Sequence, residues 1–175
     1  MDGLVARVRE ILSTTPDRWR SLTASVEPGL LTRRPAPGEW SAAECLQHLL
    51  DTEVDAFSVR LEAFLEGRDF EDFDPDAPGS KPEVGARPAE LAAKLTEARA
   101  RSLVRLATVT EADLDRTARH SELGIVTMGE MLNEWAAHDL MHTIQAERAL
   151  MQPFVVGSGK WRHYFADHDA EPVVS

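Results

Sequence analysis

Residues 127–145 read Thr-Met-Gly-Glu-Met-Leu-Asn-Glu-Trp-Ala-Ala-His-Asp-Leu-Met-His-Thr-Ile-Gln, and this stretch decides the fold. It begins with a capping box, in which a threonine oxygen and a glutamate carboxylate three residues later satisfy the free amides of a helix's first turn. Apolar residues then recur at helical spacing, so the stretch predicts a long helix from Thr127 to about Met151. His138 and His142 lie four residues apart, on one face of that helix and one turn apart.

Similar signals predict the second and third helices. Ser41 and Glu44 form another capping box, which begins a helix that reaches about Leu65. Pro88 fits the first position of a third helix, because a first turn leaves unused the amide hydrogen that proline lacks. This helix carries leucines at helical spacing: Leu91, Leu95, Leu103 and Leu106.

The first helical segment contains a proline. Apolar residues recur at helical spacing from Leu4 to Leu22. Pro16 interrupts this run. With Thr15 as a cap, it predicts the start of a second short helix rather than a kink.

Long connections separate these helices. Residues 27–39 contain several prolines and glycines and predict a loop. Residues 67–87 are acidic and rich in proline and glycine, which indicates a long surface crossover, and residues 113–124 predict an irregular link. Because strand signals are nearly absent, the pattern predicts an all-α four-helix bundle. A short amphipathic tail ends the chain, with Trp161, Tyr164 and Phe165.

Length and composition bound the possible functions. The 175 residues fit a single domain that spans residues 1–175. A formal charge of −11 repels nucleic acid and anionic membranes. No apolar segment approaches the ~18 residues of a membrane span, the start of the chain lacks a signal-peptide pattern, and Cys45 is the only cysteine. We therefore expect a cytoplasmic protein that binds neither nucleic acid nor membrane.

The histidines carry the strongest chemical signal. His138 and His142 share a packing stripe with Met131 and Trp135, and two imidazoles one turn apart can reach the ~2.0–2.1 Å distance that zinc or a similar metal requires. His48 lies on the second helix, at the edge of a stripe of small residues that leaves room for an ion and a substrate. The alternative is that each histidine is a hydrogen-bonded residue of the bundle core.

Other chemistries fit the sequence less well. A di-iron carboxylate bundle needs Glu-x-x-His on two helices, and the only similar pair is Asp139 with His142. A zincin-like protease needs a glutamate where Asp139 stands. Cys45 is a fourth ligand, a reactive thiol or, more commonly for such a residue, a small buried hydrophobe. Glu134 and Asp139 are possible general bases, whereas Gln145 is better placed but cannot take a proton.

Three stretches together resemble the DinB-like family. Pro37-Gly-Glu-Trp-Ser41, followed by Glu44 and residues 48–53, resembles the start of the family's second helix. Residues 129–145 resemble its fourth helix, and Gly159-Lys-Trp-Arg-His-Tyr164 is similar to the tail of many members. The resemblance covers nearly the whole chain.

The resemblance implies a fold and a site. The fold is a four-helix bundle that runs up-down-down-up with a long crossover, and bundle dimers are common in the family. The site holds a single metal, and the family's ligand positions fall on His48, His138 and His142. Relatives include S-transferases that use bacillithiol and isomerases that use mycothiol.

We therefore expect a metal-dependent enzyme, because three protein ligands leave one coordination position open. The metal is a divalent transition ion, with zinc and nickel favoured. It would promote the thiolate of a low-molecular-weight thiol, which attacks an electrophile in detoxification or stress response. The alternatives are a hydrolase that activates water and a non-catalytic, stress-associated metal-binding module. The expected partners are a small-molecule substrate and a second copy of the chain.

Overall fold

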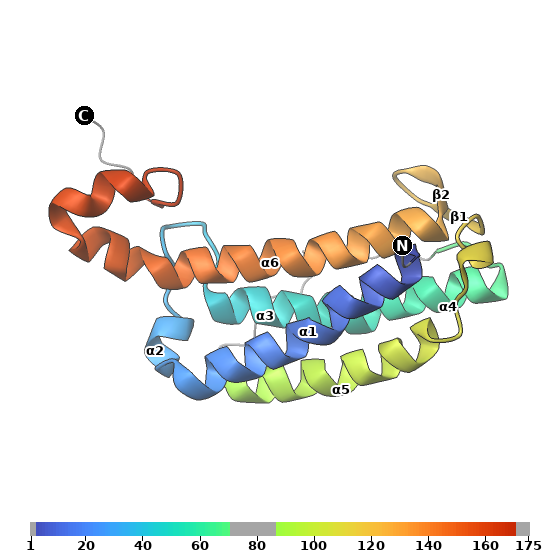
Figure 1. The fold of residues 1–175 in the computed structure, drawn as a ribbon, viewed down its shortest axis with the longest axis horizontal. Helices are drawn as coiled ribbons and strands as arrows, with labels where there is room; N and C mark the ends of the chain where they lie inside the picture. The colour runs from blue at the N-terminus through green and yellow to red at the C-terminus, as the bar shows by residue number, and fades with distance from the viewer. Residues whose placement is uncertain (1–2, 71–86, 171–175) are drawn as a thin grey trace.

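Four long helical segments form the bundle in the computed structural model, which describes residues 3–70 and 87–170 (Figure 1). In Figure 1, the first and last of these segments run in one direction and the middle two run in the opposite direction. The predicted all-α four-helix bundle is confirmed. The segments are α1 (Leu4–Ser25), α3 (Ala42–Thr52) continued by η1 (Glu53–Phe57) and α4 (Ser58–Glu66), α5 (Pro88–Leu106) and α6 (Met128–Gly157).

Side-chain caps fix where two of these segments begin. Ser41 Oγ accepts from the Glu44 amide, and the Glu44 carboxylate accepts from the Ser41 amide in return. Thr127 and Glu130 make the same pair of hydrogen bonds at the start of α6. Gly67 ends α4 with a φ of 69°, a conformation that glycine adopts without steric cost. Both predicted capping boxes are therefore present.

The predicted break at Pro16 is wrong, because α1 continues through it as one helix. Proline has no amide hydrogen, so the carbonyl of Leu12, four residues earlier, loses its usual helical donor. The guanidinium of Arg99 supplies the missing hydrogen bond, with Nη1 2.9 Å from the Leu12 oxygen. A long-range contact thus replaces the hydrogen bond that proline removes from the helix.

Residues 27–39 are not entirely a loop, because α2 (Pro28–Leu31) forms one short helical turn within them. Glu27 caps this turn by accepting from the Leu30 amide at 3.1 Å, and Pro28 occupies its first position. Most of the predicted crossover, residues 71–86, lies outside the described residues.

The link after α5 contains a β-hairpin that the sequence did not predict. It follows the short turn η2 (Glu111–Asp113) and pairs β1 (Thr117–His120) antiparallel with β2 (Gly124–Thr127). Further hydrogen bonds fasten β1 to the residues after α4, from the Phe70 amide to the Arg119 carbonyl and from the Arg119 amide to Asp69. Strands of four residues are too short for alternation to be recognised, which is why the sequence pattern missed them.

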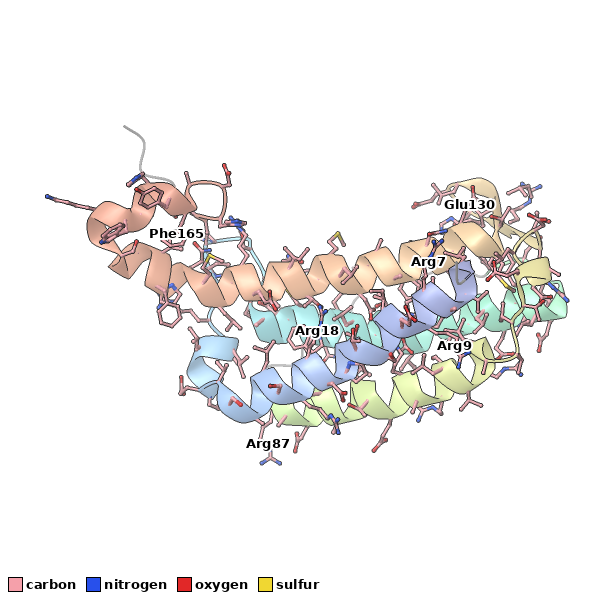
Figure 2. All side chains as sticks on the ribbon, in the orientation of Figure 1. Arg7, Arg9, Arg18, Arg87, Glu130 and Phe165 are labelled. Atoms are coloured by element: carbon pink, nitrogen blue, oxygen red, sulfur yellow. The ribbon has the colours of Figure 1, made fainter. Side chains whose placement is uncertain are left out.

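The last helix is longer than predicted, reaching Gly157 rather than about Met151 with Pro153 inside it. A 3-10 segment follows, η3 (Gly159–Phe165), whose aromatic residues Trp161 and Tyr164 are exposed. Figure 2 shows Phe165 on this tail, apart from the bundle.

A buried ionic cluster of Arg99, Glu53 and Asp139 lies at the centre of the bundle. Arg99 Nη1 is 2.7 Å from Asp139 Oδ2, and Arg99 Nη2 is 2.9 Å from Glu53 Oε2. Trp135 Nε1 also donates to the Glu53 carboxylate, at 3.1 Å. All three ionic side chains are at most 1% exposed. With the Leu12 carbonyl, the cluster joins α1, η1, α5 and α6 at one point.

We predict that Arg99→Ala destabilises the protein by about 3–5 kcal/mol, because it leaves two buried carboxylates without their cation. Urea denaturation at pH 7 measures the change in the free energy of unfolding. The control is Arg101→Ala, which removes an exposed arginine from the same helix and should cost under ~0.5 kcal/mol. Equal losses in the two variants would contradict a structural role for the cluster.

Candidate metal centre

Three histidines from two helices converge where α3 packs against α6. His48 lies on α3, and His138 and His142 lie one turn apart on α6. One ring nitrogen from each residue lies within 4.8 Å of the others. His48 Nε2 and His138 Nε2 are 3.1 Å apart. The structure thus brings together the three residues that the sequence analysis selected.

The spacing of these nitrogens fits one transition-metal ion. Tetrahedral ligands that lie about 2.0–2.1 Å from a metal are about 3.3 Å from one another. The three histidines need only small side-chain adjustments to reach that separation from the observed cluster. Imidazole nitrogens are the ligands that zinc, nickel, copper and iron share.

The hydrogen bonding of His142 prepares one of its nitrogens for a ligand role. Its Nδ1 is 2.8 Å from Gln145 Oε1. Since an amide oxygen only accepts, Nδ1 carries the proton and Nε2 has a free lone pair. Gln145 therefore orients this ring.

Burial keeps the histidines of α6 neutral. The pKa of His138 falls from 6.5 to about 3, first because of burial and then because of repulsion from His142, His48, Arg99 and Arg60. Burial also lowers the pKa of His142, against the opposing effect of Gln145. His138 Nδ1 is buried and has no hydrogen-bond partner within the described part of the chain. Neutral imidazoles have the free lone pair that a metal ligand needs.

Two aromatic side chains wall this cluster. The Trp40 ring lies 5.0 Å from the His48 ring and stacks on His142 at 5.8 Å with an interplanar angle of 19°. The Phe57 ring meets His138 edge-on at 5.2 Å. Trp40 belongs to the stretch Pro37–Ser41 that carried the family resemblance, but its sequence position gave no sign of contact with the histidines.

The two candidate bases, Glu134 and Asp139, differ in their exposure to solvent. Asp139 directs both carboxylate oxygens to Arg99, at 2.7 and 3.0 Å, so it is committed to the ionic cluster. Glu134 lies one turn before His138 with its side chain 54% exposed, and its Oε2 is 3.7 Å from Arg60 Nη1. Of the two carboxylates predicted near the histidines, only Glu134 is accessible to a substrate.

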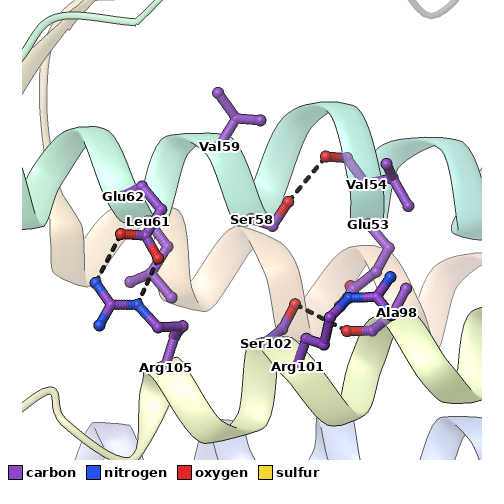
Figure 3. A pocket seen from close by; sticks show the side chains of 10 residues that line it. All are labelled: Glu53, Val54, Ser58, Val59, Leu61, Glu62, Ala98, Arg101, Ser102 and Arg105. Carbon is purple, nitrogen blue, oxygen red and sulfur yellow. Dashed lines mark hydrogen bonds and ion pairs between the residues drawn. The ribbon is translucent and has the colours of Figure 1, made fainter.

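Glu53 forms part of a cleft on the side of the bundle between α4 and α5 (Figure 3). This cleft has a volume of about 280 Å³, and the ion pair of Arg105 with Glu62 closes one end of it. The Glu53 side chain points toward α5 in Figure 3, where Oε2 meets Arg99. The cleft thus borders the ionic cluster rather than the histidines.

Cys45 is a buried core residue. It is fully covered and packs with Trp19, Leu46 and Leu49. Burial raises the pKa of its thiol to about 12, which removes thiolate character at neutral pH. The structure supports the small-hydrophobe interpretation of Cys45.

Sequence analysis missed Arg99, although a signal was present. Arg99 lies in phase with the apolar positions Leu91, Leu95 and Leu106 of α5, and all four are buried. A charge in a core position indicates a buried partner. The hairpin holds His120 half-buried, with its Nε2 3.2 Å from Arg60 Nη2.

Comparisons with known proteins agree with this fold. A family model described as the DinB superfamily matches residues 11–146. YfiT from Bacillus subtilis, described as a probable metal-dependent hydrolase with an unusual four-helix bundle topology, superposes with a TM-score of 0.70 and 20% identity, covering 83% of this chain and 85% of that one. A DinB-like protein of Bacillus subtilis, YjoA, superposes with a TM-score of 0.55 and 19% identity over 82% of this chain and 90% of that one. No curated protein sequence matches the chain.

We predict that the metal-free protein loses stability in mild acid because of His138. As the pH falls through 6.5, the unfolded chain protonates this residue, whereas the folded state keeps it neutral down to about pH 3. Stability is therefore lost between these values, and His138 accounts for up to about 2 kcal/mol of the difference between pH 7 and pH 5. Urea unfolding of the wild type and of His138→Gln at both pH values measures this contribution.

The control for this measurement is His163→Gln, in the exposed tail. It should show the same loss between pH 7 and pH 5 as the wild type. A loss that is equally large in His138→Gln would contradict the assignment.

Proposed function

Because the chain belongs to the DinB superfamily and three of its histidines converge on one point, we propose that it is a metal-dependent enzyme acting on a small molecule. The observation that carries this proposal is the cluster of three imidazoles. Catalytic metal sites use three protein ligands and keep one position open, whereas structural sites are closed by four.

His48, His138 and His142 would hold one divalent transition ion, with zinc and nickel favoured. When bound, such an ion acts as a Lewis acid that lowers the pKa of a thiol or water at the open position. Gln145 would hold the His142 ring in its ligating tautomer. Trp40 and Phe57 would limit the access of bulk water to the reacting groups.

The reaction that we favour is thiol-dependent S-transfer. A low-molecular-weight thiol would lose its proton to solvent, and its sulfur would form a bond to an electrophilic carbon as the leaving group departs with the bonding electron pair. This chemistry needs no carboxylate base beside the sulfur once the thiol pKa is lowered. It fits a site whose nearest buried carboxylate, Asp139, is held by Arg99.

Hydrolysis is the second candidate, and the exposed Glu134 favours it. Its carboxylate lies one turn before His138 and is accessible to solvent. It could accept a proton from water, which is the role of a general base. The description of YfiT as a probable metal-dependent hydrolase is consistent with this candidate.

We further propose that the chain is a single-domain homodimer that acts in cytoplasmic detoxification or stress response. Met141 and Ile144 on the outer face of α6 are 54% and 64% exposed, which supports a partner surface there. A single buried cysteine is compatible with a reducing compartment. In the part of the chain that the structure describes, no helix has the length and apolar character of a membrane span.

We predict that the protein binds one zinc or nickel ion per chain and that binding raises its melting temperature. At a free metal concentration of 100 times Kd, the gain is about 2.7 kcal/mol. His142→Ala should lose this gain, whereas the exposed-tail variant His163→Ala should keep it. Elemental analysis and thermal unfolding with and without a chelator measure both effects. Equally tight binding by His142→Ala would contradict the proposed centre.

We predict that turnover by the metal-loaded protein requires an added thiol. With a panel of electrophiles, the product should be a thioether that contains the thiol's sulfur, detected by mass spectrometry, and His142→Ala should form none. A hydrolysed product formed without thiol would instead support the hydrolase. Stabilisation by metal without any turnover would support a non-catalytic metal-binding module.

A further inference from the structure

A second cavity lies between α4, the β-hairpin and the first turns of α6. Its volume is about 370 Å³, and most of its wall is apolar, from Phe70, Ile125, Val126 and Met131. Its polar groups are Arg60, His120, Glu130 and Glu134. The Glu130 carboxylate already accepts from the amide and the hydroxyl of Thr127. A mainly apolar pocket with a few polar groups at one place is typical of a small-molecule site.

The charge of Arg60 in this cavity is poorly compensated. Its side chain is only 13% exposed, yet Nη1 lies 3.7 Å from Glu134 Oε2, too far for a hydrogen bond. Its Nε is buried and has no hydrogen-bond partner among residues 3–70 and 87–170. Arg99, which is 1% exposed, instead holds two carboxylates at 2.7–3.0 Å. Apart from Glu134, Arg60 has only the Phe70 ring, 5.6 Å from its central carbon, to offset its charge, so an anion in the cavity would be a better partner.

His120 does not supply the missing partner. Arg60 Nη2 lies 3.2 Å from its Nε2, and the Glu122 amide lies 3.2 Å from its Nδ1. Both are donors, but a neutral imidazole has only one acceptor nitrogen. The two contacts therefore compete, and neither brings a negative charge to Arg60.

The cavity adjoins the histidine cluster along both helices that form it. On η1 and α4, Phe57 contacts His138 and Arg60 follows three residues later. On α6, Glu134 lies four residues before His138. Each step is about one helical turn, or roughly 5.4 Å along the axis. Arg60 therefore lies about one helical turn from Phe57, the residue that contacts His138, although none of the three histidines lines the cavity itself.

We infer that Arg60 binds the carboxylate of the substrate, at about one helical turn from the atom that reacts beside His48, His138 and His142. This inference rests on the proposed function for the identity of the reacting atom. The planar fork of a guanidinium matches the two oxygens of a carboxylate. Glu134, near the same fork, disfavours a dianionic phosphate more than a monoanionic carboxylate. The apolar wall fits a short hydrocarbon segment of the same molecule.

The first experiment tests the subsite without metal. Side-chain spectra of protein labelled with ¹⁵N-arginine are recorded during titration with butyrate, butyl phosphate and 1-butanol. The Arg60 Nε signal, identified by its loss in Arg60→Gln, should shift saturably with butyrate, more weakly with butyl phosphate and not with butanol. The Arg101 signal, from the exposed side of α5, should stay constant.

The second experiment connects the subsite to the histidines. Protein loaded with Co²⁺ is titrated with 4-mercaptobutyrate and with 4-mercaptobutanol, and the visible absorption of the cobalt gives each Kd. The wild type and the control Arg101→Gln should bind the carboxylate-bearing thiol at least tenfold more tightly. Arg60→Gln should reduce this preference below threefold without changing the Kd of 4-mercaptobutanol. If Arg60→Gln does not fold, Arg60→Lys takes its place in this experiment, because lysine keeps the positive charge but lacks the planar guanidinium.

The two experiments test the carboxylate subsite at Arg60 and the proposed metal function separately. Absence of saturable butyrate binding, or a preference that survives in Arg60→Gln, overturns the subsite. Tighter binding of butyl phosphate than of butyrate overturns the carboxylate assignment. Failure of cobalt or of 4-mercaptobutanol to bind overturns the proposed metal function and the link to the reacting atom, while the metal-free titration still decides whether Arg60 is an anion site.

Discussion

The guanidinium of Arg99 is the contact on which the rest of the bundle depends. It bonds to a carbonyl of α1, to Glu53 on η1 and to Asp139 on α6, while its own backbone belongs to α5. Because all of these groups are buried, the loss of any one leaves a charge or a carbonyl without compensation. The four helical segments are thus fixed relative to one another by one polar centre as well as by apolar packing.

This centre also positions the candidate metal site. Asp139 follows His138 directly, so its bond to Arg99 fixes the rotation of α6 at the point where the histidines face α3. Glu53 begins the π-helical segment η1, five residues after His48. π-Helical turns are rare and are frequently found at functional sites. The extra residue in this turn lets the helix satisfy Glu53 on one side and direct Phe57 toward His138 on the other.

The features that the sequence predicted depend on local interactions, whereas the features that it missed depend on contacts between distant parts of the chain. The capping boxes at Ser41 and Thr127 act within one turn, so their spacing alone reveals them. The continuity of α1 through Pro16 depends on Arg99, which is 83 positions away in the chain, and local propensity gives no sign of it. The hairpin, too, depends on hydrogen bonds to residues 69 and 70.

The candidate site shows the same division. His138 and His142 could be paired from their spacing, whereas His48 was tied to them only by family resemblance, and Arg60 was not identified at all.

The charge of Arg60 attracts anions to the proposed subsite, whereas the overall negative charge of the chain repels them. A formal charge of −11 repels anions at long range, but salt screens that repulsion beyond about 8 Å at physiological ionic strength. Within the cavity the nearest charge is instead the positive one of Arg60, partly offset by Glu134. A dianion gains little there, since Glu134 repels it at close range. A monoanion with an apolar body is repelled less by Glu134. It is attracted by the Arg60 guanidinium, and its apolar part packs against the apolar wall. In the proposed subsite, this arrangement would favour small monoanions over highly charged molecules such as nucleotides.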